Sequence, residues 1–482
     1  MASLKKNLGY QTVNQILNTC LPLVTSPYLS RTLGATQQGV FSYTLSVVNY
    51  FTLVALLGVS NYGTRSIAEC QKNRRDAGKT FGEIYALQAF TSLLAIAAYC
   101  IFLASVPQSH PKIAAIQMIY LLGALTDINW LFFGLELFAV TVKRNIIIKL
   151  TVMSLILICV KRPEDLWLYA LIMSGSNLLT NLVLWLFLPR SIEVRAAVHI
   201  HMRDILRRVK PNLILFVPSI AFSVFHVMDK TMLGIFSTYE QVGFYYNADK
   251  VVNIPYGIIS GISAVLLPRT SSMIGSGKTG EADALFRHSF EMSVALCAAV
   301  GFGIAAISPD FTPLFFGSGF EPCIVLIEVF APIILIKGLS VLARMNYLVP
   351  HKLEPIFIQS VFLAAFVNVL CNYFLIRRYG ALGAVLGTLI AESVCLLWQY
   401  WKMRRKIVLR RSYLRSVPYL ILGASMFAVV RLLASVLHGG ILSIIQVLAM
   451  VCRPVVWRLH LPSAADDSSA ICHRQHLDGS LW

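Results

Sequence analysis

Thirteen apolar runs follow one another along the chain, and most of them are about as long as a bilayer is thick. A helix rises 1.5 Å per residue, so about 20 apolar residues cross a hydrocarbon core of roughly 30 Å. Only 13% of the 482 residues are charged, whereas soluble domains have about 25% charged residues. We therefore predict an all-α polytopic membrane protein. The predicted spans are 9–30, 38–59, 81–106, 113–134, 146–160, 166–188, 211–234, 250–268, 287–308, 322–343, 355–376, 381–401 and 416–437.

The end of the chain departs from this pattern. The run 440–452 begins a fourteenth span, but its 13 residues are fewer than the ~17 needed to cross a bilayer. Residues 453–482 then hold three of the ten His and two of the seven Trp. We predict a truncated fourteenth helix and a disordered tail. A shift of reading frame near residue 452 is our interpretation, and an ordinary disordered tail is the alternative.

Lys and Arg are unevenly divided between the two sides of the predicted spans. With the N-terminus placed inside, 28 of them lie in cytoplasmic segments and 8 in external ones. Such an excess is typical of cytoplasmic loops, so we predict a cytoplasmic N-terminus. The basic residues that give the chain its net charge of +18 then face anionic lipid. Nucleic acid is not expected as a partner.

Two stretches some 200 residues apart share a pattern. Gly39 matches Gly243, and 47–49 matches 251–253, all at an offset of 204 residues. Leu33-Gly34 matches Leu233-Gly234 at an offset of 200, which predicts four extra residues in the second loop. We infer two similar six-helix bundles in pseudo-two-fold relation. Their predicted bounds are 1–190 and 211–401, with a cytoplasmic linker at 191–210, and 402–452 holds the two further helices.

Polar side chains recur on one face of several spans. Such side chains face partners or water rather than lipid. Interhelical hydrogen bonding explains any single one, but the matched set predicts a water-filled cavity between the two bundles. The stripes comprise Gln11, Asn14, Asn18 and Thr25; Ser42, Ser46 and Asn49; Gln117, Tyr120 and Asp127; Asn212, Ser219, Ser223, His226 and Lys230; and Asn253, Tyr256, Ser260 and Ser263.

Charged residues within the spans are the strongest candidates for function, because a charge at mid-membrane costs at least about 2.5 kcal/mol. Lys337 and Arg344 are seven residues apart and share a helical face. Glu328 lies half a turn out of phase with Lys337, and Pro332 between them predicts a kink. Either a substrate anion or a buried partner, Glu328 or Glu392, would balance Lys337.

Asp229 and Lys230 stand side by side at the end of the seventh span. We predict that they cap its external mouth and mirror Arg31 in the other bundle. A charge pair that reaches to water from the interface is the alternative interpretation.

Several motifs together resemble one family. They are "SPYLSRTLG", "GVFSYTLSVVNYF", "LGVSNYGTRSIA", "DINWLFFGLELFAVTVKRN" and "DKTMLG…EQVGFYYNADKVVNIP", and their order holds over about 7–440. The chain resembles the bacterial oligosaccharide-repeat-unit flippases of Wzx type, within the multidrug/oligosaccharidyl-lipid/polysaccharide exporter superfamily. The resemblance implies a MATE-like fold, alternating access and a bacterial inner-membrane location. It also implies an undecaprenyl-pyrophosphate-linked oligosaccharide substrate, moved from the inner to the outer leaflet for O-antigen, capsule or exopolysaccharide, and a polysaccharide polymerase complex as a further partner.

This substrate assigns roles to the candidate residues. Cations would meet the diphosphate, polar side chains would meet sugars, and carboxylates would serve coupling or gating. The substrate candidates are Lys337, Arg344, Arg31, Lys230, Asp229, His226, Asn14, Asn18, Asn49, Asn253 and Tyr120, and the coupling candidates are Asp127, Glu328 and Glu392. No cofactor or metal is expected, and the choice between a proton and a sodium gradient stays open.

Three alternatives were weighed against this function. A cation-coupled drug or metabolite antiporter of MATE type commonly has a carboxylate in its first helices, and the first span here is uncharged. A lipid-II-type peptidoglycan flippase would differ only in its headgroup. An enzyme is not expected, because no external loop much exceeds 16 residues and none has a paired-carboxylate or His/Asp cluster.

Overall fold

The computed structural model describes the chain except residues 1, 71, 189–191, 194, 197–200 and 438–482. Side chains are described from Leu21 onward, apart from those at 214–215, 217–222, 224–226, 258 and 435–437. The predicted fourteenth span and the predicted tail therefore lie outside the described residues. Within the described part every regular element is a helix, which confirms the predicted fold class.

The first half of the chain forms what we name the N-terminal lobe, residues 2–185. Its helices are α1 (Ala2–Leu56), α2 (Val59–Cys70), α3 (Arg74–Ser105), α4 (Pro111–Gln117), α5 (Ile119–Thr126), α6 (Asn129–Gly134), α7 (Phe138–Cys159) and α8 (Leu166–Trp185). The first two predicted spans are the two parts of α1, and the fourth is divided among α4, α5 and α6. A short 3₁₀ turn, η1 (Pro163–Asp165), precedes α8.

The second half forms the C-terminal lobe, residues 202–403, with α18 packed against its α13. Its elements are α11 (Met202–Phe236), α12 (Tyr239–Gly275), α13 (Thr279–Phe316), α14 (Pro322–Phe330), α15 (Ile333–Ala343), the π-helical turn η2 (Arg344–Leu348), α16 (Glu354–Tyr379), α17 (Ala381–Met403) and α18 (Arg410–Leu437). Every predicted span falls on a helix or a series of short helices. Ten described helices or series are long and apolar enough to cross a membrane.

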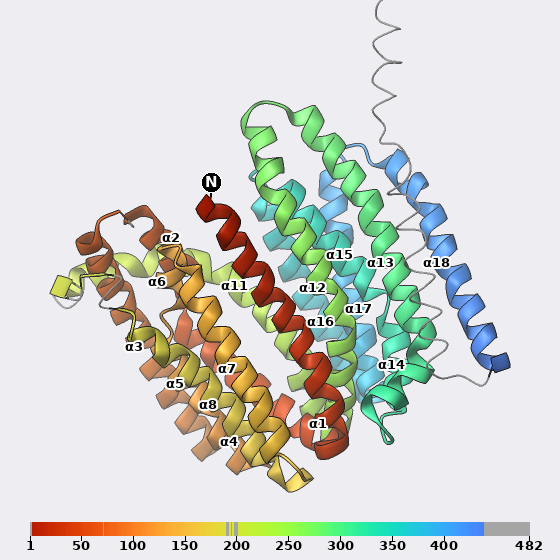
Figure 1. Ribbon diagram of the computed structural model, residues 1–482, viewed down its shortest axis with the longest axis horizontal. Helices are drawn as coiled ribbons and strands as arrows, with labels where there is room; N and C mark the ends of the chain where they lie inside the picture. Colours follow the sequence, from red (N-terminus) through yellow and green to blue (C-terminus); the bar gives the residue numbers. More distant parts are fainter. Residues whose placement is uncertain (1, 71, 189–191, 194, 197–200, 438–482) are drawn as a thin grey trace, which may run out of the picture.

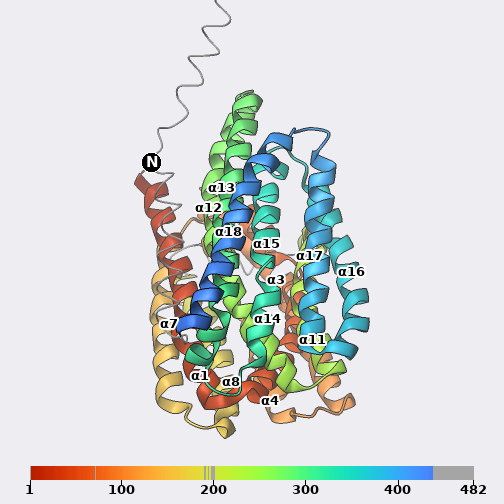
Figure 2. The ribbon, with the colours of Figure 1, turned by 90° about the vertical axis from the view of Figure 1, so that its right-hand side faces the viewer.

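The two lobes stand side by side, and α1 runs between them (Figure 1). It packs on α3 and α7 of its own lobe and on α12 of the other. Turned by 90°, α18 crosses the outer face of α13 (Figure 2). Each lobe has its own apolar core, built around Trp130 and Phe81 in the first and around Phe316 and Phe330 in the second. Ala35 of α1 joins the core of the second lobe, so the two lobes are in apolar contact at this point.

The two halves bend at equivalent places. Gly34, with φ 73°, separates the two parts of α1, and only a residue without a Cβ adopts this conformation readily. In the second half, α11 ends at Phe236 and α12 begins at Tyr239. The second connection thus has two residues, 237 and 238, where the first has Gly34 alone. Pro332 separates α14 from α15, which confirms the predicted interruption of that span.

Two predicted boundaries are corrected by the structure. The last nine residues of the predicted linker, 202–210, form the beginning of α11, where Arg208 contacts Glu83 of the N-terminal lobe at 2.8 Å. The fifth span begins earlier than predicted, since α7 starts at Phe138. Arg144 and Lys149 were counted as cytoplasmic loop charges, but they lie within this helix.

The matched glycines of the two repeats meet where α1 crosses α12. A Cβ on Gly39 would lie 1.6 Å from the carbonyl oxygen of Tyr239, and one on Gly243 would lie 1.9 Å from that of Ala35. Any side chain at either position would therefore overlap the main chain of the other lobe. The close approach of the lobes at this end depends on both glycines.

Candidate functional site

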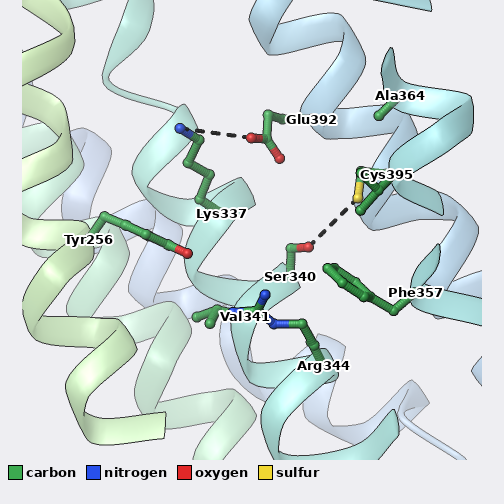
Figure 3. A pocket seen from close by; sticks show the side chains of 10 residues that line it. Tyr256, Lys337, Ser340, Val341, Arg344, Phe357, Ala364, Glu392 and Cys395 are labelled. Atoms are coloured by element: carbon green, nitrogen blue, oxygen red, sulfur yellow. Dashed lines mark hydrogen bonds and ion pairs between the residues drawn. The ribbon is translucent and has the colours of Figure 1, made fainter. Parts of the chain in front are cut away.

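A polar pocket in the C-terminal lobe contains the best candidate from the sequence. Lys337 and Arg344 come from one face of α15 and η2, and Glu392 faces them from α17 (Figure 3). The Lys337 Nζ lies 3.8 Å from Glu392 Oε1, and both side chains are less than a tenth exposed. Arg344 stacks on the ring of Phe357 at 5.0 Å. The pocket thus holds two cations and one carboxylate.

A chain of polar contacts connects this pocket to α11. Lys230 pairs with Asp249 at 3.1 Å, and the Asp249 carboxylate accepts a hydrogen bond of 2.5 Å from Asn253. Asn253 Oδ1 in turn accepts from Lys337 Nζ at 3.4 Å. The structure therefore brings together three of the predicted substrate residues, Lys230, Asn253 and Lys337, across α11, α12 and α15. The free volume of the pocket is about 40 Å³, which suits a water-sized group in this conformation.

An apolar groove lies on the other side of the same helices. It measures about 830 Å³ and is bordered by α12, α13, α15 and α18. Ile259 and Ile262 of α12 face Met292 and Leu296 of α13, and Val429 closes the side formed by α18. The polar pocket and the groove share the wall made by α12 and α15. An amphiphilic molecule can therefore place its polar and apolar parts on two sides of one wall.

A second polar pocket, of about 560 Å³, lies within the N-terminal lobe between α1, α5, α7 and α8. Two predicted residues, Tyr120 and Asp127, line it. Asp127 accepts hydrogen bonds from the main-chain N and the Nδ2 of Asn129, at 2.9 and 2.6 Å. Asn129 Oδ1 accepts from Arg144 at 3.0 Å. Asp127 is thus tied to α7 through one amide.

The predicted position of Asp229 is wrong. It is 3% exposed and lies inside the C-terminal lobe rather than at a mouth. Its carboxylate accepts hydrogen bonds from Tyr245, Asn368, Asn372 and Thr388, at 2.6–2.9 Å. Four donors from α12, α16 and α17 stabilise this buried charge. A carboxylate at an external mouth, or one that reaches to water, would be hydrated and would not need them. Lys230, beside it in sequence, turns instead to Asp249.

Glu328 is not the partner of Lys337. It pairs with Arg431 of α18, and both side chains are about 30% exposed. Of the two carboxylates expected as partners of Lys337, the structure pairs it with Glu392. Arg31 is exposed and donates to the carbonyl of Leu314 at 2.6 Å, beside a third pocket of about 480 Å³ between α1 and the loop that follows α13. It contacts the other lobe but lies apart from the Lys337 pocket.

The remaining predicted residues are only partly placed. Asn49 is half-buried on α1. Asn14 and Asn18 lie on α1 and His226 on α11, but their side chains lie outside the described ones. Among the stripe residues that are described, Ser46 and Asn212 bond across the lobes, to Thr231 and to the carbonyl of Leu57. These two make interhelical hydrogen bonds rather than lining a described cavity.

Several pocket residues were not predicted as site residues. Arg144, Asn145 and Lys149 line the N-terminal pocket from α7, and Asn177 and Asn181 from α8. A signal for the first two existed, because the motif "DINWLFFGLELFAVTVKRN" that carries the family resemblance contains them. Counting basic residues as loop markers obscured it.

Comparison with known proteins agrees with this architecture. The family described as "Polysaccharide biosynthesis protein" matches residues 4–274, and that described as "Lipid II flippase MurJ" matches 177–453. A protein of Escherichia coli (strain K12) described as an O-antigen transporter is 23% identical over 398 residues, which are 81% of this chain and 94% of that one.

Solved structures share the fold. The inward closed conformation of the lipid II flippase MurJ superposes with a TM-score of 0.72 at 12% identity, covering 93% of this chain and 99% of that one. An inward-facing multidrug resistance MATE family transporter superposes with a TM-score of 0.58 at 12% identity, covering 80% and 98%. This chain belongs to the polysaccharide biosynthesis protein family and has the MATE-like fold of a Wzx-type flippase.

Proposed function

We propose that this protein moves lipid-linked oligosaccharides from the inner to the outer leaflet of a bacterial inner membrane, for the synthesis of a surface polysaccharide. Its membership of the polysaccharide biosynthesis family and its likeness to an O-antigen transporter support this function. The observation that carries it is the shared wall of α12 and α15, which has a cationic pocket on one side and an apolar groove on the other. A lipid-linked diphosphate likewise has an anionic headgroup and an apolar chain.

The polar pocket suits the diphosphate. Lys337 and Arg344 supply two cations, and Arg binds phosphate oxygens with a planar pair of donors. The contact between Lys337 and Glu392 is long for an ion pair, at 3.8 Å, so a phosphate oxygen can replace the carboxylate. The pocket must widen beyond its present 40 Å³ to admit the headgroup. We assign that widening to the alternating movement of the lobes.

Glu392 is the coupling candidate that this exchange favours. When the diphosphate pairs with Lys337, Glu392 loses its ion-pair partner. A buried carboxylate without a partner is costly, so it then requires a proton or a metal cation. Substrate binding and cation uptake are thereby linked at one side chain. Glu328, which pairs with Arg431 instead, has no such connection to the pocket.

The apolar groove suits the prenyl chain. Its walls are mostly aliphatic side chains and methionines from four helices, with four serines, His288 and Tyr419 among them. Burial of apolar area contributes about 25 cal/mol per Å². The groove is lined in part by α18, which lies at the outer edge of the molecule beyond α13 (Figure 1). The prenyl chain can therefore stay near lipid while the headgroup is transferred. A cytoplasmic N-terminus, predicted from the distribution of basic residues, places the loading side on the cytoplasmic leaflet.

Export assays in a host that lacks its own repeat-unit flippase test this function. We expect the wild-type gene to restore surface polysaccharide, Lys337→Ala to abolish it, and Lys337→Arg to retain part, because charge survives while geometry changes. Loss of Lys337 alone leaves Glu392 buried without a partner, which destabilises a protein by about 3–5 kcal/mol. Membrane abundance must therefore be measured beside export.

A double variant separates recognition from stability. Lys337→Met with Glu392→Leu removes both charges and keeps the volume, so the folded protein should accumulate normally. Export should nevertheless stay absent if Lys337 binds substrate. Normal export by this double variant would refute the role of the Lys337 pocket, and no export by the wild type would refute the function itself.

A lipid II flippase is the second candidate, because the MurJ family matches residues 177–453 and the MurJ structure superposes over 93% of the chain. The substrate would share the diphosphate and the prenyl chain, and the two functions differ in the sugar. Rescue of a strain depleted of its lipid II flippase distinguishes them. We propose transport rather than catalysis in either case, in line with the relatives.

A further inference from the structure

The pocket of the N-terminal lobe has the composition of a sugar-binding site. Its wall includes side-chain amides and hydroxyls from five helices, which donate and accept hydrogen bonds as sugar hydroxyls do. Its volume of about 560 Å³ lies within the range of small-molecule sites, roughly 300–1,000 Å³. A single ion or a few waters would not require such a space. The amides and hydroxyls are those of Asn129, Asn145, Asn177, Asn181, Thr25, Tyr120, Ser176 and Thr180.

Arg144 gives this pocket a positive character. The pocket has one other cation, Lys149, and one carboxylate, Asp127, so its formal charge is +1. Arg144 is only 6% exposed. Its Nε and Nη2 donate to Asn145 Oδ1, at 3.2 and 2.7 Å, and its Nη2 also donates to Asn129. Both of these acceptors are neutral amides.

One end of the Arg144 fork has no hydrogen-bond acceptor among the described residues. Its Nη1 is fully buried and makes no hydrogen bond. Buried donors are rarely left without a partner, and a guanidinium needs one more than a neutral group does. Because Arg144 lines the cavity, a ligand there can satisfy this donor once the side chain turns toward it. A carboxylate is the acceptor that fits a guanidinium best.

We propose that this pocket is a saccharide subsite, and that Arg144 makes it select a sugar with a carboxylate substituent. The proposal rests on the proposed function, since it assigns a second contact point to the same lipid-linked oligosaccharide. The diphosphate is held by the C-terminal lobe at Lys337, and an acidic sugar of the repeat unit is held by the N-terminal lobe at Arg144. The substrate then contacts both lobes.

Paired export assays test the selectivity. One host makes a lipid-linked repeat unit with a glucuronic acid residue, and a matched host makes the same unit with glucose at that position. We expect Arg144→Gln to lower export of the glucuronate unit by about tenfold or more, as loss of one charge-assisted hydrogen bond does. Export of the glucose unit should change less than about twofold. Arg65→Gln, at an exposed arginine of α2 outside the pocket, is the matched control and should change neither.

Purified wild-type protein provides a readout that needs no variant to fold. Sodium glucuronate should raise its melting temperature by about 2 °C or more relative to glucose or to sodium chloride at equal ionic strength. Arg144→Lys keeps the charge without the fork, so it should retain a smaller shift.

Three results would overturn the proposal. Equal losses of both repeat units in Arg144→Gln would indicate a structural role, and equal shifts with chloride and glucuronate would indicate a simple anion site. No glucuronate shift would exclude the subsite. Export of neither unit by wild-type protein that still shows the glucuronate shift would instead refute the proposed function, while the shift would support the carboxylate site.

Discussion

Replacing Gly39 with alanine tests how closely the two lobes must approach. The new Cβ would lie 1.6 Å from the carbonyl oxygen of Tyr239, whereas real Cβ atoms essentially never come within 3.0 Å. Helices α1 and α12 must therefore separate by at least about 1.4 Å, the difference between the two distances. The obstacle is main chain, which has no rotamer to change. Gly39→Ala should disfavour this closed contact without disturbing the core of either lobe.

The size of the effect follows from the overlap. Overpacking costs about 1–3 kcal/mol, which corresponds to a shift of roughly 5–150-fold between two conformations. Because the overlap is with backbone, we expect a value near the upper end of this range. The alternative conformation is one in which the α1–α12 contact is open. Gly243→Ala should act in the same direction, since its Cβ would lie 1.9 Å from the carbonyl oxygen of Ala35.

Cysteine labelling measures this shift. Ser46 is 3% exposed on α1, and its hydroxyl lies 2.8 Å from that of Thr231 in the other lobe. In purified, otherwise cysteine-free protein, we expect Ser46→Cys to react with a maleimide about 5–150 times faster when Gly39→Ala is present. Gly261→Ala, also on α12 but with nothing within 4 Å of its Cβ, is the control. Folded Gly39→Ala protein that labels at the rate of the control would refute the reasoning.

Three further substitutions have expected outcomes in thermal melting of the purified protein. Asp229→Asn replaces one carboxylate oxygen with an NH₂ group, which is a donor facing other donors. Because hydrogen bonds to a charged group contribute about 1.5–3 kcal/mol each, we expect the free energy of unfolding to fall by at least ~3 kcal/mol. Unchanged melting would contradict the role of the carboxylate as the shared acceptor of these four donors. Gln88→Leu removes the acceptor of the buried Trp130 indole N–H, 2.9 Å away, and should cost about 1–3 kcal/mol; a smaller loss would mean that water replaces the amide. Arg431→Gln leaves Glu328 without its partner inside a predicted span, so the loss should be about 2.5 kcal/mol or more; a loss below about 1 kcal/mol would show that water screens the pair.

The internal repeat relates several of the residues discussed above. Gly39 and Gly243 occupy equivalent positions, and the structure brings each against the main chain of the other lobe. Asn49 and Asn253 are equivalent as well, but only Asn253 contacts a charged network, with Asp249 and Lys337. The two lobes therefore share a scaffold and differ in chemistry. The proposed diphosphate site belongs to the second lobe because Lys337 lies there.

Much of the fold was determined by the sequence alone, because spans and kinks depend on local properties. A run of about 20 apolar residues must form a helix in a bilayer, where backbone groups find no other partners. The break at Pro332 likewise needs no tertiary contact, since proline lacks the N–H of a helix interior. The face shared by Lys337 and Arg344 follows from helix geometry, and both side chains do line one pocket.

Partners across helices were decided only by the tertiary structure. Glu328 and Glu392 were equal candidates for Lys337, and the packing of α17 against α15 selected Glu392. Asp229 was expected at an external mouth, because a charge near the end of a span is ordinarily exposed. Instead α12, α16 and α17 supply it with four donors. Arg144 precedes the short predicted span 146–160, and Lys149 lies near its beginning. Both were counted among the 28 cytoplasmic basic residues, yet they line a pocket with α1, α5 and α8. One-dimensional patterns report how each residue meets lipid or water, whereas the pairing of buried charges depends on which helices pack together.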